Sequence, residues 1–287
     1  MTYRNELLLD VPEDVYHADP CDVPALSQSI AHTLISKSPA HAYLEHPRLG
    51  GEPRVATSSM DRGSLVHALL LGKGAKIHPV VADDWKTKAA REERDAARAA
   101  GELPALQSEI EQAFAIVDVV RPKLARLGVV LDGHSEVVIL WSVETDCDPI
   151  QCRARVDHIA ADGTIYDLKT TGKIVPPRKM GRHFCEYGYE IQAAAYTQAI
   201  ETVDPRRAGR VQFRDVAIEM TKPHCVTVAA PDGRMRELGE RRWSRACERW
   251  AECLRSGEWP EYSGEVVYVS PPPWEVTDEE EEGSMVG

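Results

Sequence analysis

The sequence predicts a fold that combines helices and strands, α/β in the broad sense and α+β in the narrower one. A mixed central sheet is flanked by helices and preceded by a helical N-terminal part. Three observations predict it. Before residue 130, apolar residues recur every three to four positions, which is typical of amphipathic helices. Residues 136–170 instead alternate and are rich in Val and Ile, as strands are. A further helix, two strands and a long helix follow over residues 189–256.

Four helices are expected in the N-terminal part. The first begins after the cap residue Ser27 and ends before Ser38-Pro39, because the residue before a proline disfavours helix. Gly72 stops the second. The third is Ala-rich and charged, and we expect it to be exposed. The fourth has a strong amphipathic pattern in which Pro122 could introduce a kink. The segments that contain these helices are Ser27–Tyr43, Ser59–Leu71, Lys86–Ala100 and Leu106–Leu127.

The remaining elements form the expected α/β core. The predicted strands are Glu136–Val143, Ile150–Ala160, Thr164–Thr170, Val211–Met220 and His224–Ala230, and the predicted helices are Tyr189–Ile200 and Met235–Ser256. We expect a single domain over residues 1–274, with a catalytic core at about 59–230. Residues 275–287 contain six acids and no base, a composition typical of a disordered tail.

Composition limits the classes of function. The chain of 287 residues is 43% hydrophobic and 28% charged, as in soluble globular proteins. It has no apolar run near the roughly 18 residues of a membrane span and no signal-peptide pattern, so we expect a cytoplasmic protein. Its seven scattered cysteines contain no C-x-x-C pair, which disfavours a zinc site or a disulfide framework. The net charge of −12 weakens a nucleic-acid hypothesis without excluding it, because basic residues could line one cleft.

One predicted strand contains the motif Asp167-x-Lys169. Side chains alternate along a strand, so these two residues share a face, and a tight turn brings back the preceding strand with Asp157. Two carboxylates suit Mg²⁺, and a nearby lysine can orient an attacking water, so the cluster is a candidate phosphodiester-hydrolysis site. A surface ion pair is the alternative for Asp167 and Lys169 alone. The similar Asp84-x-Lys86 lies beside a charged helix, and we interpret it as a chance match.

Two helical motifs accompany this cluster. His67 lies in Gly63-x-x-x-His67, and Gln192 and Tyr196 stand four apart on one helical face. Taken singly, a core or capping histidine and a packing role are the alternatives. In order, however, G-x-x-x-H, a strand-end Asp, D-x-K and Q-x-x-x-Y resemble the RecB-like branch of the PD-(D/E)xK nuclease superfamily. The resemblance implies a restriction-endonuclease-like core.

A longer series resembles the RecE-type exonuclease VIII nuclease domain of phages and prophages, from Tyr16 to about Trp274. The segments that carry it are YHADP with LSQSIAHTLISKSPAHAY, MDRGSLVHALLLG, WKTKAAREERDAARAAGELPAL, CRARVDHI with YDLKTT, YGYEIQAAAYTQAI, and GEWPEYSGEV with PPPW. This resemblance implies a processive 5′→3′ exonuclease on linear double-stranded DNA that leaves 3′ tails for recombination. It also implies a ring-shaped homotetramer, a single-strand annealing partner of the RecT type and, for a phage-encoded protein, the bacterial host cytoplasm.

The resemblance also assigns roles by position. It implies Mg²⁺ as the cofactor, with Mn²⁺ as a substitute, and Lys169 as the catalytic lysine. Gln192 and Tyr196 match the motif that supports the site or contacts DNA. The implied metal ligands are His67, Asp157, Asp167 and the Leu168 carbonyl, with Glu136 as a further, outer contact. Ser38-Pro39 stands where relatives with an iron–sulfur cluster have Cys-Pro, so no such cluster is expected.

A 5′→3′ enzyme is expected to have a 5′-phosphate pocket. The candidate residues are Ser27, Ser29, Lys37 and Arg62, for each of which a helix cap or a solvated charge is the alternative. Two other functions remain open at this point. One is a different PD-(D/E)xK nuclease, specific for single strands or for a DNA structure. The other is a catalytically silent module that binds DNA ends.

Overall fold

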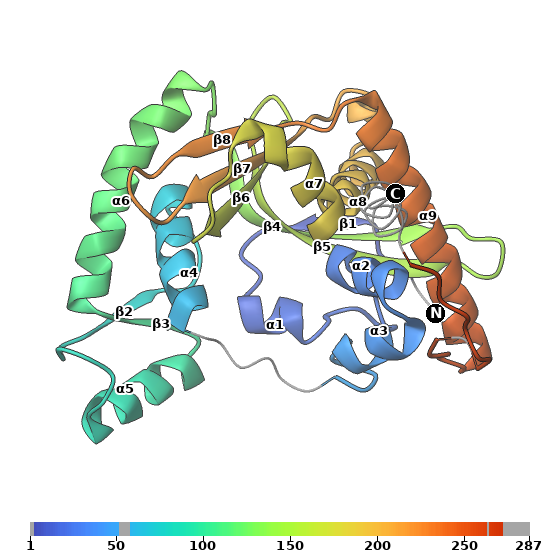
Figure 1. Cartoon of the computed structure of the whole chain (residues 1–287), viewed down its shortest axis with the longest axis horizontal. Coiled ribbons are helices and arrows are strands. Elements are labelled where there is room, and N and C mark those ends of the chain that lie inside the picture. Colours follow the sequence, from blue (N-terminus) through green and yellow to red (C-terminus); the bar gives the residue numbers. More distant parts are fainter. Residues whose placement is uncertain (1–2, 52–57, 263, 272–287) are drawn as a thin grey trace, which may run out of the picture.

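A six-stranded mixed sheet forms the centre of the computed structural model, which describes residues 3–51, 58–262 and 264–271. The strands lie in the order β1-β4-β5-β6-β7-β8 (Figure 1). β6 and β7 pair in parallel, whereas the other neighbours pair antiparallel. The strands are β1 (Glu6–Leu8), β4 (His134–Val143), β5 (Ile150–Ile159), β6 (Ile165–Thr171), β7 (Phe213–Glu219) and β8 (Val226–Ala229).

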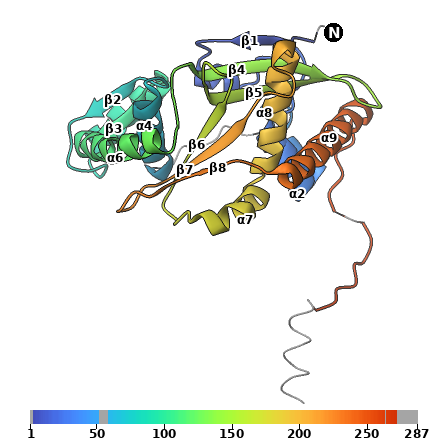
Figure 2. The same ribbon diagram turned by 90° about the horizontal axis from the view of Figure 1, so that it is seen from above.

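One face of the sheet packs against α2 (Gln28–Ser36), α8 (Tyr189–Val203) and α9 (Gly233–Ser256). These helices form the largest apolar core, in which Trp141 of β4 and Trp250 of α9 are fully buried. The predicted cap is confirmed, because the Ser27 side chain accepts a hydrogen bond from the Ile30 N–H at the start of α2. Figure 2 shows these helices on the side of the sheet away from α4 and α6.

The other face packs against α4 (Ser58–Leu71) and α6 (Gln107–Arg126). Tyr166 and Leu168 of β6 point into this second core, whereas Ile165 points into the first. The predicted alternation along this strand is therefore confirmed. Pro122 lies inside α6, which continues to Arg126.

Shorter elements complete the fold. The helices are α1 (Glu13–His17), α3 (Pro39–Glu45), α5 (Lys88–Ala99), α7 (Pro177–Tyr187) and the 3₁₀ turn η1 (Pro205–Arg207), and β2 (Ile77–Val80) and β3 (Leu103–Leu106) form a small parallel sheet. α2 ends before Ser38, as predicted, and α3 then begins with Pro39 in its first turn. α7 and the small sheet were not predicted.

The predicted α/β architecture, with a mixed sheet flanked by helices, is confirmed. The predicted acidic tail, residues 275–287, lies outside the described residues. Within the described part of the chain, no helix is both long enough and apolar enough to cross a membrane.

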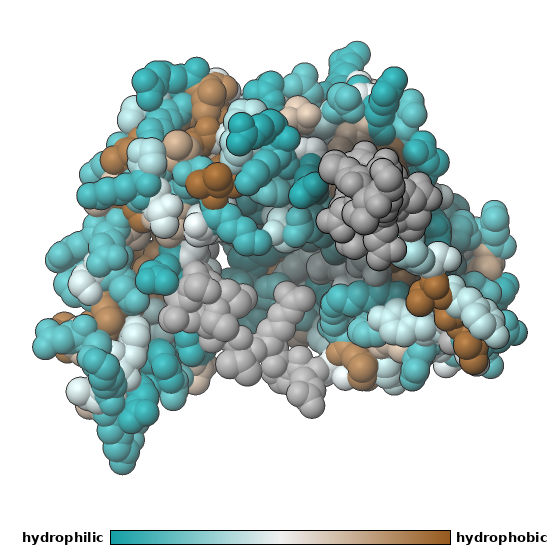
Figure 3. Space-filling model, in the orientation of Figure 1, coloured by the Kyte–Doolittle hydropathy of each residue, from teal (hydrophilic) through white to brown (hydrophobic). Residues whose placement is uncertain are grey.

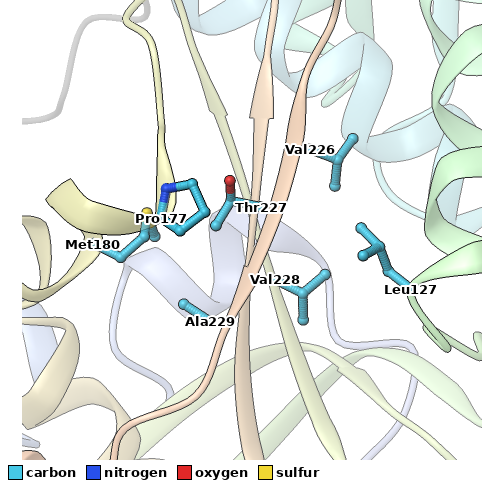
Figure 4. A pocket seen from close by; sticks show the side chains of 7 residues that line it. All are labelled: Leu127, Pro177, Met180, Val226, Thr227, Val228 and Ala229. Atoms are coloured by element: carbon cyan, nitrogen blue, oxygen red, sulfur yellow. The ribbon is translucent and has the colours of Figure 1, made fainter.

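An apolar hollow of about 210 Å³ lies beside the edge strand β8 (Figure 4). Its lining residues are Leu127, Pro177, Met180, Val226, Thr227, Val228 and Ala229. None of the predicted site residues is among them. The hollow therefore borders the sheet edge and is separate from the candidate site.

Candidate active site

Four carboxylates lie in a row across four neighbouring strands. Asp167 of β6 is paired with Asp215 of β7. The β5–β6 pairing ends one residue before Asp157 and Asp167 would face each other. The β4–β5 pairs on either side place Glu136 opposite Asp157. The sheet therefore gathers acidic side chains that lie far apart in the sequence.

Asp157 fills the place where β5 and β6 separate. The Leu168 N–H, which no longer meets a backbone carbonyl of β5, donates a hydrogen bond of 2.7 Å to Asp157 Oδ2. The N–H and C=O of one residue point to the same edge of an extended strand. The Leu168 carbonyl therefore faces the Asp157 side as well, where the resemblance expects a metal ligand.

Asp167 is held at both of its oxygens. Oδ1 accepts a hydrogen bond of 2.7 Å from Gln192 Nε2 of α8, and Oδ2 lies 2.5 Å from Lys169 Nζ. The Asp167 side chain is 1% exposed, and Lys169 is 27% exposed, so the ammonium group lies between the buried carboxylate and the surface. Tyr196, one turn after Gln192, donates to the Arg155 carbonyl of β5 at 3.0 Å. Tyr196 is buried and supports β5, which excludes direct contact with DNA in this conformation.

α4 delivers His67 to the other side of Asp157. His67 Nε2 lies 3.1 Å from Asp157 Oδ2, and Nδ1 lies 3.3 Å from Glu136 Oε1. Gly63, one turn earlier, explains the first position of the G-x-x-x-H motif. A Cβ there would lie 2.6 Å from Thr170 Oγ1 of β6, so only glycine allows this close approach of helix to strand.

Glu136 connects His67 to a further cation. Its Oε2 forms an ion pair with the Arg155 guanidinium of the neighbouring strand. The backbone of Glu136 has φ +56°, a conformation uncommon for residues other than glycine. This local break in β4 turns the side chain toward His67 and Arg155.

The electrostatics of the cluster favour a bound cation. Burial alone would lower the pKa of His67, but the carboxylates of Asp157 and Glu136 raise it to about 9. Burial raises the pKa of Asp167 against the opposing effect of Lys169. The pKa of Asp157 is lowered despite its burial, mainly by His67. A proton on His67 thus occupies a position where the surrounding carboxylates stabilise positive charge.

The types of donor atom in this cluster fit a hard divalent ion, but in this structure the donor groups contact other side chains of the cluster. Carboxylate oxygens, an imidazole nitrogen and a backbone carbonyl come from neighbouring elements here, and these are the donor types expected of an Mg²⁺ or Mn²⁺ site. Among the residues that the structure describes, no group of three or more His, Cys, Asp or Glu side chains is already arranged as a metal site. Asp157 binds His67, and Asp167 binds Lys169. Binding of an ion therefore requires these pairs to separate.

The predicted 5′-phosphate residues do not form one pocket. Ser27 and Ser29 are hydrogen-bonded to each other at the start of α2. Lys37 follows the other end of this nine-residue helix, about 13 Å away along its axis, and pairs with Glu45 at 2.9 Å. Arg62 is exposed on α4. The length of α2 separates Lys37 from the two serines, and their contact with a 5′-phosphate stays a prediction.

The alternative motif Asp84-x-Lys86 behaves as a surface ion pair. The two side chains approach to 2.8 Å, and the Lys86 side chain is 89% exposed. No described candidate residue contacts them. The interpretation of this copy as a chance match agrees with its place on the surface.

Sequence reasoning missed two residues of this site. Asp215 is fully buried, and both of its carboxylate oxygens lack a hydrogen-bond partner within the described residues. The Tyr189 ring lies under Lys169, with Nζ 5.0 Å from the ring centroid. An acid at an inward position of the apolar strand segment 211–220 was the available signal for Asp215.

Comparison with known proteins identifies the family. The description "PDDEXK-like domain of unknown function (DUF3799)" applies to a family whose pattern matches residues 29–272. The chain belongs to the DUF3799 family. The D-x-K strand and its partners therefore lie in a PD-(D/E)xK nuclease fold, as the motif order indicated. A search of proteins with curated functions found no significant match to this DUF3799 protein.

One solved structure shares the fold of this DUF3799 protein. The structure named "Putative exonuclease" from Eubacterium rectale is 12% identical, covers 94% of this chain and 98% of its own, and superimposes with a TM-score of 0.61. A "phage related exonuclease" from Haemophilus somnus 129PT is 11% identical over 84% of this chain and 98% of its own, with a TM-score of 0.33. At this identity the first similarity shows the fold alone.

Proposed function

We propose that this DUF3799 protein is an Mg²⁺-dependent 5′→3′ exodeoxyribonuclease. It degrades linear double-stranded DNA and leaves 3′ single-strand tails for recombination by strand annealing. The observation that carries the nuclease proposal is a set of adjoining contacts: Asp157 contacts His67 and the Leu168 N–H, and Asp167, the residue before Leu168, pairs with Lys169. A module that only binds DNA has no physical need for carboxylates clustered toward a phosphate, since they repel it.

The residues of the chain divide the work. His67, Asp157 and Asp167, with the Leu168 carbonyl, would hold the cation, and Glu136 contacts His67 from the side away from Asp157. Gln192 fixes Asp167, and the Leu168 N–H fixes Asp157, so both carboxylates keep their orientation. A cation in the site would compete with Lys169 for Asp167, and Lys169 would then be free to orient the attacking water at the phosphate.

Mg²⁺, when bound, supplies Lewis-acid activation of the phosphate and lowers the pKa of a water. Mn²⁺ is expected to substitute, and no iron–sulfur cluster takes part. The polarity, the ring-shaped homotetramer and the annealing-protein partner belong to the same proposal. Their support is the resemblance to RecE-type exonucleases, with which the name of the Eubacterium rectale structure is compatible.

The test is digestion of linear duplex DNA labelled at either the 5′ or the 3′ end. We expect Mg²⁺-dependent release of the 5′ label first, with closed circular and single-stranded DNA consumed slowly. Asp167→Asn and Lys169→Met should lower the rate by at least about 10²-fold. Asp84→Asn and Lys86→Met make the same two substitutions in the exposed Asp84–Lys86 ion pair and should leave the rate unchanged.

Three results would contradict parts of the proposal. Wild-type rates in Asp167→Asn or Lys169→Met would overturn the site assignment. Rapid loss of single-stranded or circular DNA would favour another PD-(D/E)xK nuclease. Tight binding of DNA ends without hydrolysis in Mg²⁺ or Mn²⁺ would favour a silent end-binding module.

A further inference from the structure

The exposed face of α7 is a basic surface on an acidic protein. Met180 and Phe184 bury the helix against the body, and Arg178, Lys179 and Arg182 are exposed on the other side. No acidic side chain in the described ranges pairs with these three cations, and Glu186 is the single acid of the helix. On a chain with a net charge of −12, such a basic surface is suited to bind a negatively charged partner.

α7 is rigidly connected to the strand that carries the candidate catalytic lysine. Five residues lie between the end of β6 and the start of α7. Along this connection, the Val175 N–H donates to Glu219 Oε1 at 2.9 Å, and the Val175 carbonyl accepts from Thr227 Oγ1 at 2.6 Å. These bonds fix the start of α7 to β7 and β8. Its basic face therefore has a defined position relative to Lys169.

Aromatic rings lead from the site to the surface beside α7. Lys169 lies over the Tyr189 ring, whose centroid is 5.6 Å from that of Tyr187. Tyr187, the last residue of α7, is 37% exposed. Lys173 Nζ lies 3.0 Å from the Tyr187 hydroxyl and 5.7 Å from its ring centroid. Cations and rings thus continue from Lys169 to the outer surface.

The shape of the molecule allows a long partner to reach both places. Figure 1 shows α7 above the space between α4 and α2. Figure 3 shows a recess on this face whose visible lining is hydrophilic. Arg178 and Arg182, one helical turn apart, are separated by about 6 Å along the axis, close to two nucleotide steps of about 3.4 Å.

We propose that α7 binds one strand of the DNA substrate next to the scissile phosphate. Arg178, Lys179 and Arg182 contact successive backbone phosphates, and Tyr187 stacks on a base with Lys173 beside it. A polyanion matches the unpaired cations, and the exposed ring distinguishes a nucleic-acid strand from a simple phosphate, because every base offers a face for stacking. This inference rests on the proposed nuclease function.

The charge part is tested by the dependence of duplex binding on salt, measured by fluorescence anisotropy in EDTA so that no DNA is hydrolysed. Each phosphate contact contributes about 0.9 to the slope of log K against log [salt]. The triple variant Arg178→Ala/Lys179→Ala/Arg182→Ala should lose about 2 to 3 from this slope and bind on the order of 10²-fold more weakly at 0.1 M salt. In Mg²⁺, the loss should fall mainly on KM.

Two matched variants separate charge from general damage. Lys86→Ala/Lys88→Ala/Arg91→Ala removes the same formal charge at and before α5, at the far end of the molecule from α7, and should keep the wild-type slope (Figure 1). Arg178→Lys/Lys179→Arg/Arg182→Lys keeps the charge on α7 and should keep most of the slope. If the α7 alanine variant has the wild-type slope, or if both alanine triples lose the same amount, the inference is overturned.

The stacking part is tested with single-stranded DNA. Tyr187→Ala should weaken its binding by about 5- to 100-fold, whereas Tyr187→Phe should retain it. Equal binding by wild type and Tyr187→Ala overturns the stacking role. The nuclease proposal fails separately: a wild-type protein that binds through α7 but does not hydrolyse DNA refutes the chemistry and leaves this surface in place.

Discussion

Replacing Asp215 with asparagine should stabilise the protein at alkaline pH and leave its stability at acid pH almost unchanged. Asp215 is fully buried, and its oxygens have no hydrogen-bond partner among the described residues. Burial, followed by the neighbouring charge of Asp167, raises its pKa to about 7 from 3.8. The folded protein therefore keeps a proton on Asp215 that the unfolded chain releases at much lower pH.

The magnitude follows from linkage. Between about pH 4 and pH 7 the folded state binds more protons than the unfolded state, so the free energy of unfolding falls as the pH rises. Each pH unit in this window costs at most about 1.4 kcal/mol, and by pH 8 the penalty approaches about 4 kcal/mol. The asparagine side chain of the variant has no proton to lose. Asparagine and protonated aspartic acid have nearly the same shape, so the two proteins should be about equally stable near pH 4.

Urea unfolding at pH 4.5 and pH 8, in EDTA, measures the effect. We expect Asp215→Asn to gain about 2 to 4 kcal/mol relative to wild type between the two pH values. Asp118→Asn, which removes an exposed carboxylate on α6, is the control and should show no such difference. Equal effects of Asp215→Asn at both pH values, or a loss at pH 8, would refute the electrostatic reasoning.

Two glycine substitutions test close approaches between elements. Gly63→Ala places a Cβ 2.6 Å from Thr170 Oγ1, so it should displace His67 and lower kcat/KM at least about tenfold in the DNA assay. The double variant Gly63→Ala/Thr170→Ala should recover part of this activity. Full activity of the single variant would show that α4 can shift without affecting the site. Gly239→Ala places a Cβ 2.2 Å from the Glu190 carbonyl oxygen of α8 and should lower the free energy of unfolding by about 2 to 3 kcal/mol. Gly233→Ala, in the first turn of the same helix with nothing within 4 Å of the added Cβ, is the control and should be neutral or slightly stabilising in urea unfolding.

The candidate site was predictable where local periodicity determines which way a side chain points. Asp167 and Lys169 share a face because strands alternate, and Asp157 reaches them because a tight turn joins β5 to β6. The four-residue spacing of Gln192 and Tyr196 placed both on one helical face, but only Gln192 reaches a carboxylate. The different roles of these two residues depend on how α8 crosses the sheet, which local periodicity does not encode.

Other features depend on long-range pairing. Asp215 joins the site because β7 pairs with β6 after two intervening helices, and no local pattern specifies this register. Ser27 and Lys37 flank the two ends of α2, and the sequence alone did not show how far apart that helix holds them. α7 has recognisable boundaries in Pro177 and Gly188, but its mixture of basic and aromatic residues hides its two buried positions.

The protonated state of His67 has a consequence for how the proposed site would take up Mg²⁺. With a pKa of about 9, the imidazole is charged at neutral pH, and an ion that binds this nitrogen must expel the proton into solution. Loading with Mg²⁺ would then acidify a weakly buffered sample by close to one equivalent per site. The apparent affinity for the ion should strengthen about tenfold for each pH unit up to about pH 9, so the enzyme would retain its metal best in alkaline surroundings.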